Sequence, residues 1–553
     1  MRTVIWKNKS SKFFLVAFAI CGLLGIGMPA SAATAGSWTA PSNVISTTNS
    51  IDSGQVVSDS SGNLTAIWRQ LVGSDYLTQA SSKPVGGSWS PTVTISPAGK
   101  STDSLKLVID RAGNVLAVWR VTEISGYTIQ SASKSQLGSW SAPVDVSVVG
   151  QVLSGTSLVM DNSGNVTAVW STTARQLYSA TKNQAGAWSS AVAISAAASY
   201  FIQLPELVAD AEGSVTAVWD QNDGTNSVYA ATLNQGLWSA PDQLPAPGTN
   251  AFGAQVTIDG SGTAIAMWTA GTGPDITVSS RKTAAGTWST PLQEVGLGSD
   301  FGLVDLASDR HGNLTAIGFT SNGPTSYIYA SSKQSGGNWS TTSSLSDPTG
   351  EVRDVQLSVD QNGNAVAIWQ WSPNSFTPVF YVQSSTMPSG ESWSTALNLS
   401  AQSGYDLIPT LNTGASGNLL VSWNFVDYPN YFVQYSAMNW NYTLSYFANS
   451  GLGTAPTQQV GAGGAAINVA SGSALTRSGY TFSGWNTRAD GTGTAYAAGS
   501  SISLSADTAL YAQWTPALAA TGSAAFIPEA ALGGLAVLCG AGILLALRRR
   551  TLR

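Results

Sequence analysis

The stretch DSSGNLTAIW, residues 59–68, decides the fold of this chain because near-copies of it recur along most of the 553 residues. The aspartates that open the copies are Asp59, Asp110, Asp161, Asp210, Asp259, Asp309 and Asp360, and one further copy opens on Gly414. The tryptophans that close them are Trp68, Trp119, Trp170, Trp219, Trp268, Trp369 and Trp423. Successive copies lie about fifty residues apart, which is typical of proteins that assemble one supersecondary unit many times.

The acid, the glycine and the tryptophan of each copy are interpreted as scaffold. An aspartate at the head of a turn can accept hydrogen bonds from backbone amides two or three residues further on, and the glycine can adopt the positive φ that such turns need. Because the same residue types return at equivalent places in every unit, we expect the tryptophans to pack the units together.

Each period predicts four short strands. In the copy around Asp110 they are residues 105–110, 115–120, 127–134 and 140–147, and the alternation of the second predicts a strand with one buried face. A second marker, GSW or a close variant, begins the fourth strand, where a proline such as Pro143 is tolerated only on an edge. Four antiparallel strands per period predict an all-β chain built around a β-propeller.

The phase of the repeats predicts how the ring closes. The repeats fill residues 33–440, which open with a lone outer strand, GSWTAPSNVIS at 36–46, and end with only the three inner strands of a unit. Joining the two fragments predicts an eight-bladed propeller, with seven blades as the alternative count. Pairing of the first strand with the last would lock the ring.

Positions that differ among the copies are the candidates for ligand binding. The residue after the strand tryptophan is Arg69 in the first copy and Arg120 in the second, and Arg175 lies close to this position in the third. Guanidinium groups from neighbouring blades would suit an anionic ligand. The sequence predicts no catalytic residue, no cofactor and no metal, since the single histidine, His311, has no second histidine with which to share zinc.

The repeated turn is similar to the Asp-box of sialidases and related propellers, although its residues follow a different order. In that family the box is a structural turn, and the active site needs three arginines, a tyrosine with a glutamate, and an acid. The resemblance implies one alternative function, an extracellular sialidase-like glycoside hydrolase, and carries over no catalytic residue.

A second module is predicted at residues 441–515. It contains GYTFSGW at 479–485 and LYAQW at 510–514, which closely resemble the Listeria–Bacteroides repeat, also called the internalin B-repeat. The resemblance implies a small β-grasp-like module of bacterial surface proteins, used as a stalk or interaction unit. Its core is expected to contain Tyr480, Phe482, Trp485, Leu510, Tyr511 and Trp514. Its place in the chain suggests a spacer.

The two ends predict export and anchoring. Residues 1–32 combine lysines, an apolar run and small residues, as in a secretory signal. Residues 516–529 form a linker, residues 530–547 an apolar span long enough for a transmembrane helix, and residues 548–553 a basic cytoplasmic tail. The linker holds the motif Leu518, Ala519, Ala520, Thr521 and Gly522. This order resembles a Gram-positive LAxTG sorting signal, which implies sortase and cell-wall peptidoglycan as partners.

Charge and cysteine content argue against a nucleic-acid-binding function and against disulfide bonds in the exported part. The chain has 24 Lys and Arg against 30 Asp and Glu, a net charge of −6, which disfavours a nucleic-acid partner. Its two cysteines, Cys21 and Cys539, fall in the predicted signal and span, so the exterior would hold no disulfide.

We therefore expect a secreted, wall-anchored surface protein, held by its membrane helix where it is not sorted. Its propeller would serve adhesion to a glycan or a protein. A sialidase-like hydrolase and a passive surface-layer or stalk protein remain as alternatives.

Overall fold

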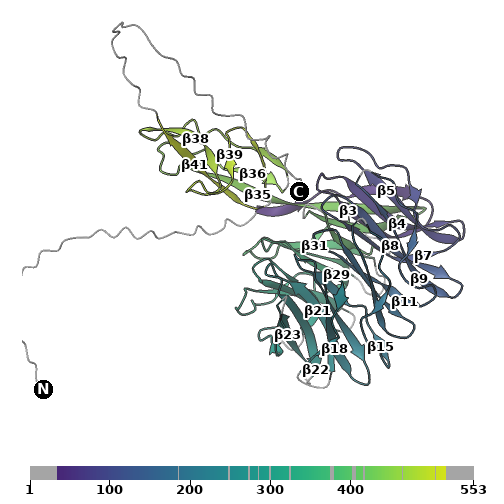
Figure 1. Ribbon diagram of the computed structural model, residues 1–553. Coiled ribbons are helices and arrows are strands. Elements are labelled where there is room, and N and C mark those ends of the chain that lie inside the picture. The colour runs from purple at the N-terminus through teal and green to yellow at the C-terminus, as the bar shows by residue number, and fades with distance from the viewer. Residues whose placement is uncertain are drawn as a thin grey trace, which may run out of the picture.

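The computed structural model describes residues 34–517, except 137, 185, 247–249, 272–274, 284–285, 298–300, 323–324, 374–378, 401–406, 415–417, 464 and 505 (Figure 1). Within these ranges the chain forms strands and no helix, so the all-β prediction is confirmed there. None of the described segments is a helix that could cross a membrane. The predicted signal, sorting motif, apolar span and basic tail lie outside the described residues.

Most of the chain forms sets of four antiparallel strands. Each set is called a blade. The blades are numbered in chain order, and the strands of a blade are counted outward from the innermost one. Blade 1 contains β3 (Ile51–Ser58), β4 (Leu64–Val72), β5 (Asp75–Lys83) and β6 (Val93–Thr94). Blade 2 contains β7 (Thr102–Ile109), β8 (Val115–Glu123), β9 (Gly126–Lys134) and β10 (Val144–Asp145). Blade 3 contains β11 (Val152–Met160), β12 (Val166–Thr172), β13 (Leu177–Lys182) and β14 (Val192–Ala193).

The following blades repeat this order. In blade 4 the innermost position is shared by two short strands, β15 (Phe201–Ile202) and β16 (Glu206–Ala209). The middle strands are β17 (Val215–Asn222) and β18 (Asn226–Asn234). The outermost position is again shared by two short strands, β19 (Leu237–Trp238) and β20 (Asp242–Leu244). Blade 5 contains β21 (Asn250–Ile258), β22 (Ala264–Gly271), β23 (Ile276–Lys282) and β24 (Leu292–Gln293). Blade 6 contains β25 (Gly302–Ser308), β26 (Leu314–Asn322), β27 (Thr325–Lys333) and β28 (Ser343–Ser344). Blade 7 contains β29 (Glu351–Val359), β30 (Ala365–Ser372), β31 (Tyr381–Met387) and β32 (Leu397–Asn398).

The last sheet joins the two ends of the repeat region. It contains β33 (Thr410–Thr413), β34 (Leu419–Asp427) and β35 (Asn430–Phe447), and its outer strands are β1 (Thr34–Trp38) and β2 (Ser42–Thr47). Both β1 and β2 pair with β35 in antiparallel fashion, as the phase of the repeats predicts. This set is called the closing sheet.

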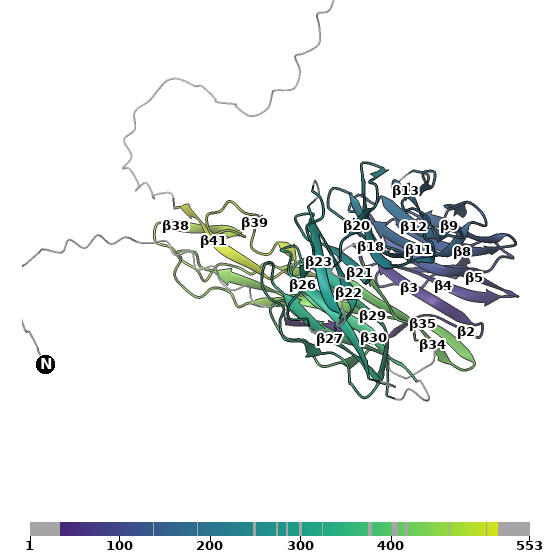
Figure 2. The ribbon, with the colours of Figure 1, turned by 90° about the horizontal axis from the view of Figure 1, so that it is seen from below.

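The innermost strands meet one another around a circuit. In order, β3 contacts β7, and the series continues through β11, β16, β21, β25 and β29 to β33, which returns to β3. Sheets arranged radially in this way define a β-propeller-like fold, seen from two directions in Figures 1 and 2. The short outer strands pair on one side only, in agreement with the prolines that precede them.

The repeated turns have the predicted scaffold role. Asp59 Oδ1 accepts hydrogen bonds from the backbone amides of Ser61 and Asn63, both at 2.9 Å, so the bonds reach two and four residues ahead. Gly62 has a φ of 85°, in the region that glycine adopts without strain. His311 occupies an exposed place in the corresponding turn of blade 6.

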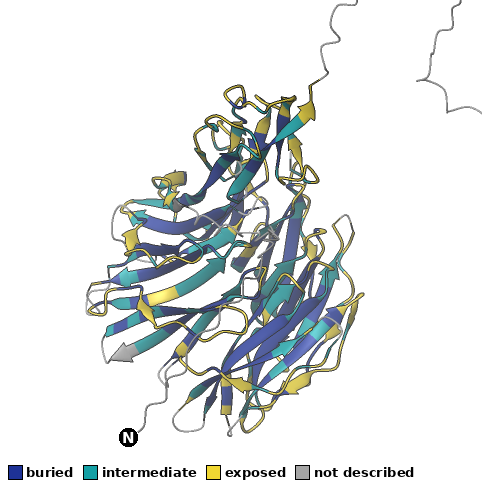
Figure 3. Ribbon diagram, turned by 90° about the vertical axis from the view of Figure 1, so that its left-hand side faces the viewer, coloured by how far each residue is buried: buried dark blue, intermediate teal, exposed yellow. Residues whose placement is uncertain are grey.

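The second strands are buried on both faces, which corrects the prediction of a half-buried strand. All seven residues of β12 are buried, and Trp68, Trp119 and Trp268 have no exposed surface. The reason is that each blade lies between two neighbours, so both of its faces are covered (Figure 3). Trp119 of blade 2, for example, shares one hydrophobic cluster with Ile67 and Ala80 of blade 1.

The second module continues directly from the closing sheet. It contains β36 (Gln459–Ala462), β37 (Ala466–Asn468), β38 (Tyr480–Asn486), β39 (Ala495–Tyr496), β40 (Ser501–Ser503) and β41 (Thr508–Pro516). The 18-residue strand β35 lies in both parts and pairs in parallel with β41 beyond Tyr442. One hydrophobic cluster accordingly includes Trp423 of the closing sheet together with Trp485 and Leu510 of the module.

The predicted core of the module is confirmed in most of its members. Trp485 and Leu510 are buried, and Phe482 contacts the rings of both Trp485 and Trp514. Tyr480 departs from the prediction, because 38% of its surface is exposed and its ring lies under the guanidinium of Arg477. Tyr480 is the first residue of β38; Thr481 beside it is also exposed, and the strand is first partly buried at Phe482.

Candidate functional site

Two of the three arginines predicted to bind a ligand, Arg69 and Arg120, form ion pairs within their own blades. Arg69 contacts Asp52 at 3.1 Å and lies 4.2 Å from the ring centre of Tyr76. Arg120 repeats this arrangement with Asp103 and Tyr127. Each arginine therefore links the innermost, second and third strands of its blade.

Arg120 has the fuller set of partners. Its guanidinium donates to both carboxylate oxygens of Asp103, at 2.7 and 2.8 Å, and to the carbonyl oxygen of Leu153 in blade 3. Arg175 lies in the turn between β12 and β13 and donates to the carbonyl oxygen of Ser199 at 2.7 Å. Among the described interactions, none joins one of these three arginines to another. The arrangement suits structural cross-links better than an open anion site.

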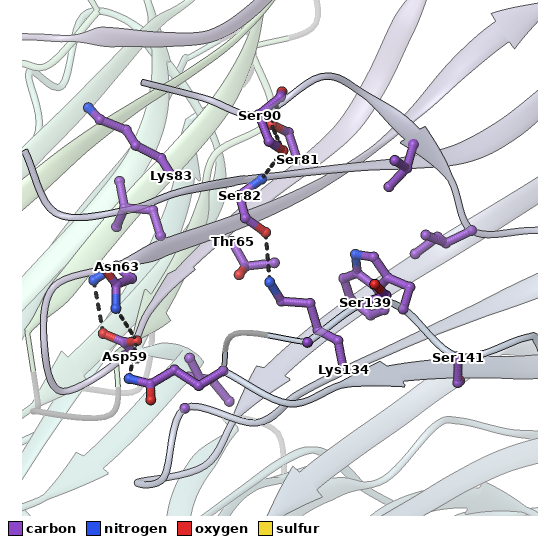
Figure 4. Close-up of a pocket in the computed structure, with 18 of the residues that line it drawn as sticks. Asp59, Asn63, Thr65, Ser81, Ser82, Lys83, Ser90, Lys134, Ser139 and Ser141 are labelled. Atoms are coloured by element: carbon purple, nitrogen blue, oxygen red, sulfur yellow. Dashed lines mark hydrogen bonds between the residues drawn. The ribbon is translucent and has the colours of Figure 1, made fainter. Parts of the chain in front are cut away.

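A cavity of about 670 Å³ lies between blades 1 and 2, on the side of the D-x-x-G-N turns. Its volume falls in the range of about 300–1,000 Å³ that small-molecule sites occupy. Blade 1 contributes the turn at Asp59 and the chain from Ser81 to Ser96, and blade 2 contributes Lys134 and the segment around Trp140. Figure 4 shows Asp59 and Asn63 to one side of Lys134, with Ser139 and Ser141 to the other.

Lys134 is the central polar group of this cavity. Only 8% of its surface is exposed, and Nζ donates a 2.7 Å hydrogen bond to Oγ of Ser82 across the blade interface. Burial lowers the pKa of Lys134, while the negative charge of Asp59 acts in the opposite direction. An ammonium group can donate three hydrogen bonds, and Ser82 takes one of them.

Asp59 is held by the surrounding amides. Its Oδ2 accepts hydrogen bonds from the side chains of Gln136 in blade 2 and Asn63, each at 2.7 Å. Burial would raise the pKa of Asp59, but the bonds from Gln136 and Asn63 outweigh it and hold that pKa below its ordinary value. The carboxylate is thus ionised and already well bound.

The remaining lining combines an aromatic ring, apolar side chains and hydroxyls. Trp140 and Ile95 supply large apolar surfaces, while Thr65, Ser82 and Ser90 supply hydroxyls. Trp140 is partly exposed, and no hydrogen bond of its Nε1 occurs among the described residues. Such a mixture can hold the apolar face of a sugar ring while bonding its hydroxyl groups.

From the sequence, Trp140 is expected to pack between blades, and nothing in the repeat points to Lys134. Its counterpart in blade 3, Trp188, does serve packing, since Nε1 donates to Oγ of Ser131 in blade 2 at 2.8 Å. The cavity at that next interface is only about 30 Å³. The repeat sequence alone therefore does not reveal that the cavity beside this tryptophan differs in size from one blade interface to the next.

A second cavity of about 490 Å³ lies among the innermost strands. Lys106 and Glu206 face it, together with residues of β3 and β33. Burial raises the pKa of Glu206, and the charge of Lys106 opposes this rise. This central channel carries charge but holds fewer hydrogen-bonding hydroxyls and no tryptophan among its described lining residues.

Asp305, on the innermost strand of blade 6, has a strongly raised pKa. Burial raises the pKa of Asp305 to about 7, although backbone amides of Leu357 and Leu306 donate to its carboxylate; the charge of Glu206 adds to the rise. The ordinary value is 3.8, so the folded chain keeps a proton that the unfolded chain releases.

Asp305 should therefore make stability fall as pH rises from about 4 to 7. Relative to Asp305→Asn, the wild type is expected to lose roughly 2–4 kcal/mol of unfolding free energy between pH 4 and pH 8. Urea unfolding of both proteins at several pH values measures this difference. A difference that does not change with pH would contradict the assignment.

Comparisons with known proteins identify the second module. Residues 442–513 match the model of the Listeria-Bacteroides repeat domain, which confirms the resemblance noted in the sequence. No curated protein matches the chain.

Solved structures match at low identity. The BP39L lectin from Burkholderia pseudomallei is 15% identical with a TM-score of 0.41, over 61% of this chain and 95% of that chain. The polysaccharide lyase Uly1 is 10% identical with a TM-score of 0.38, over 62% of this chain and 90% of that chain. A lectin of Aleuria aurantia is 14% identical with a TM-score of 0.34, over 55% of this chain and 98% of that chain.

Proposed function

We propose that this chain is a carbohydrate-binding protein of the cell surface, whose binding site is the cavity between blades 1 and 2. The observation that carries the proposal is the composition of that cavity. A tryptophan, several hydroxyls and a buried lysine surround about 670 Å³. Aromatic surface with a few convergent polar groups is the usual make-up of a small-ligand site.

Binding is favoured over hydrolysis by the carboxylates available. Among the described lining residues, Asp59 is the only acid, and its oxygens accept hydrogen bonds from Gln136, Asn63 and the turn amides. Glycoside hydrolysis commonly needs two carboxyl groups, one of which must be able to give up a proton. Asp59 alone, with its pKa lowered, is suited to hold the turn and one wall of the site.

The surface location is part of the proposal. Counting the closing sheet as a blade would give the propeller eight, and the Listeria-Bacteroides repeat continues from that sheet toward the C-terminus. An exported chain, sorted at Thr521 and joined to peptidoglycan, would present the propeller outward. The signal-like start, the LAATG motif and the apolar span support this location.

A glycan array probed with the full-length chain tests the function. We expect saturable binding to one class of glycan, reduced at least tenfold by Trp140→Ala and retained by Trp188→Ala. Trp188 occupies the same repeat position in blade 3, so it controls for general loss of packing. Arg120→Ala should also retain binding, because that guanidinium is paired with Asp103 outside the cavity. A flat array, or equal loss in both tryptophan variants, would contradict the proposal.

A further inference from the structure

In five blades a lysine precedes the GSW-type tryptophan by six residues, and in blades 2 and 6 that lysine is buried. Lys134 and Trp140 of blade 2 face blade 1, and Lys333 and Trp339 of blade 6 face blade 5, with the same spacing between lysine and tryptophan. At both interfaces the lysine is at least nine-tenths buried. The two interfaces therefore carry equivalent donor groups at equivalent positions.

At the interface of blades 5 and 6, a carboxylate lies between these donors. Glu294 Oε2 accepts hydrogen bonds from Nζ of Lys333 at 2.5 Å and from Nε1 of Trp339 at 2.9 Å. Its other oxygen, Oε1, accepts a hydrogen bond from Ser279. Burial would raise the pKa of Glu294, but the bonds from Lys333 and Ser279 outweigh it and lower that pKa, so the carboxylate is ionised.

The equivalent position in blade 1 is Ile95. The backbone amide of Glu294 donates to the carbonyl oxygen of Thr277, and that of Ile95 donates to the carbonyl oxygen of Thr78, in both cases directly after the fourth strand. Ile95 has no acceptor, and Ala80 stands where blade 5 has Ser279. Lys134 and Trp140 of blade 2 thus face an open cavity. Blade 1 has no carboxylate there that corresponds to Glu294 of blade 5.

The neighbouring interfaces close the same position in other ways. Lys182 donates to carbonyl oxygens of its own blade, including Gly186. Lys282 donates to Thr232 of blade 4, while Nε1 of Trp288 is buried there with no hydrogen-bond partner among the described residues. Blade 7 and the closing sheet carry Met387 and Met438 in place of the lysine. Among the described cavities, the one between blades 1 and 2 alone places both donors in a large open space.

The geometry points to a ligand carboxylate that takes the place of the Glu294 side chain, so that the sugar bound between blades 1 and 2 is a uronic acid. This inference rests on the proposed function and names its ligand class. The carboxylate accepts from Nζ of Lys134 and Nε1 of Trp140, as Glu294 does from Lys333 and Trp339. The ring lies against Trp140 and Ile95, within reach of Ser82 and Ser90.

Local charge favours this ligand although the chain as a whole is acidic. The described lining carries the positive charges of Lys83 and Lys134 against the single negative charge of Asp59. The amide groups of Gln136 and Asn63 bind the Asp59 carboxylate and reduce its repulsion of an incoming anion. A buried ammonium gains most from a partner that is itself charged.

Titration calorimetry on the full-length chain with methyl glucuronide and methyl glucoside tests the inference. We expect the glucuronide to bind at least tenfold more tightly, and Lys134→Met to bring the two affinities within about twofold. Ile95→Glu should abolish binding of both sugars and raise the thermal midpoint, because it builds the blade 5 carboxylate into the cavity. Lys182→Met, which changes the equivalent lysine of blade 3 outside this cavity, is the matched control for Lys134→Met and should bind like the wild type.

The outcomes separate the two proposals. Equal binding of both sugars would overturn the uronic acid assignment and leave carbohydrate binding intact. Binding of neither sugar, together with a flat glycan array, would overturn both. Tight binding of a glutamate-containing peptide in place of the glucuronide would assign the cavity to an acidic protein segment and overturn the sugar.

Discussion

Glu294→Leu should destabilise the protein by about 3–5 kcal/mol, the usual cost of removing one partner from a buried ion pair. The substitution leaves the ammonium of Lys333 without its carboxylate, at a place where that lysine is only 9% exposed. It also leaves Nε1 of Trp339 without its acceptor. Urea unfolding followed by tryptophan fluorescence measures the loss.

Two other blade interfaces carry an apolar pair in place of Glu294 and Lys333, and they suggest a matched control. Leu345 with Met387 and Leu399 with Met438 occupy the equivalent positions at the next two interfaces. The double variant Glu294→Leu with Lys333→Met should therefore recover most of the lost stability, since a well-packed apolar pair can replace a buried ion pair. A single variant within about 1 kcal/mol of the wild type, or a double variant no better than the single, would contradict this account.

Ending the chain at residue 440 should destabilise the propeller itself, not only remove the module. The cut falls inside β35, and Met438 and Trp440 share one buried cluster with Leu444 and Trp485 beyond it. Uncovering two large apolar side chains costs about 1.5–3 kcal/mol for each when burial is complete. The expected loss is roughly 3 kcal/mol or more relative to the full chain.

Urea unfolding of the two chains tests this prediction, with a chain that ends at residue 517 as the control. The control keeps every described strand and should unfold like the full-length protein. Equal midpoints for the chain cut at 440 and the control would show that the module is an independent spacer, as its place in the sequence suggested.

The repeat pattern was sufficient to predict the blades. Each D-x-x-G-N turn fixes a hairpin, and the tryptophan at its end has to be buried wherever the unit recurs. The same pattern misled on burial, because alternation in a single strand does not reveal that a second blade covers the other face. The continuity of β35 was also hidden, since the change in composition at Asn441 falls in the middle of a strand.

The arginines show why side-chain roles were harder to predict. With a regular hairpin, Arg69 would lie opposite Ser53, but an irregularity in β3 between Asp52 and Gln55 places Asp52 there instead. The same shift brings Asp103 opposite Arg120. One extra residue in each innermost strand therefore turned two candidate ligand-binding groups into internal ion pairs.

The cavity depends on contacts between blades, which no single repeat describes. A signal was nonetheless present in the sequence. At the position of Ile95, blades 2, 3, 6 and 7 carry Val146, Ile194, Leu345 and Leu399, and blade 5 carries Glu294. The one acidic exception marks the place where a lysine of the next blade has a carboxylate partner. Lys134, Lys182 and Lys282 lack one in the sequence alike, and only the structure shows that Lys134 alone of these three faces a large cavity.

We propose the cavity between blades 1 and 2 as the ligand site of the propeller. A crystal structure of the full-length chain grown with methyl glucuronide tests it most directly. We expect the sugar in this cavity, with its carboxylate within 3.2 Å of both Nζ of Lys134 and Nε1 of Trp140, as is typical of charge-assisted hydrogen bonds of about 2.7–3.2 Å. A sugar bound instead in the central channel beside Lys106, or at the paired arginines Arg69 and Arg120, would contradict it.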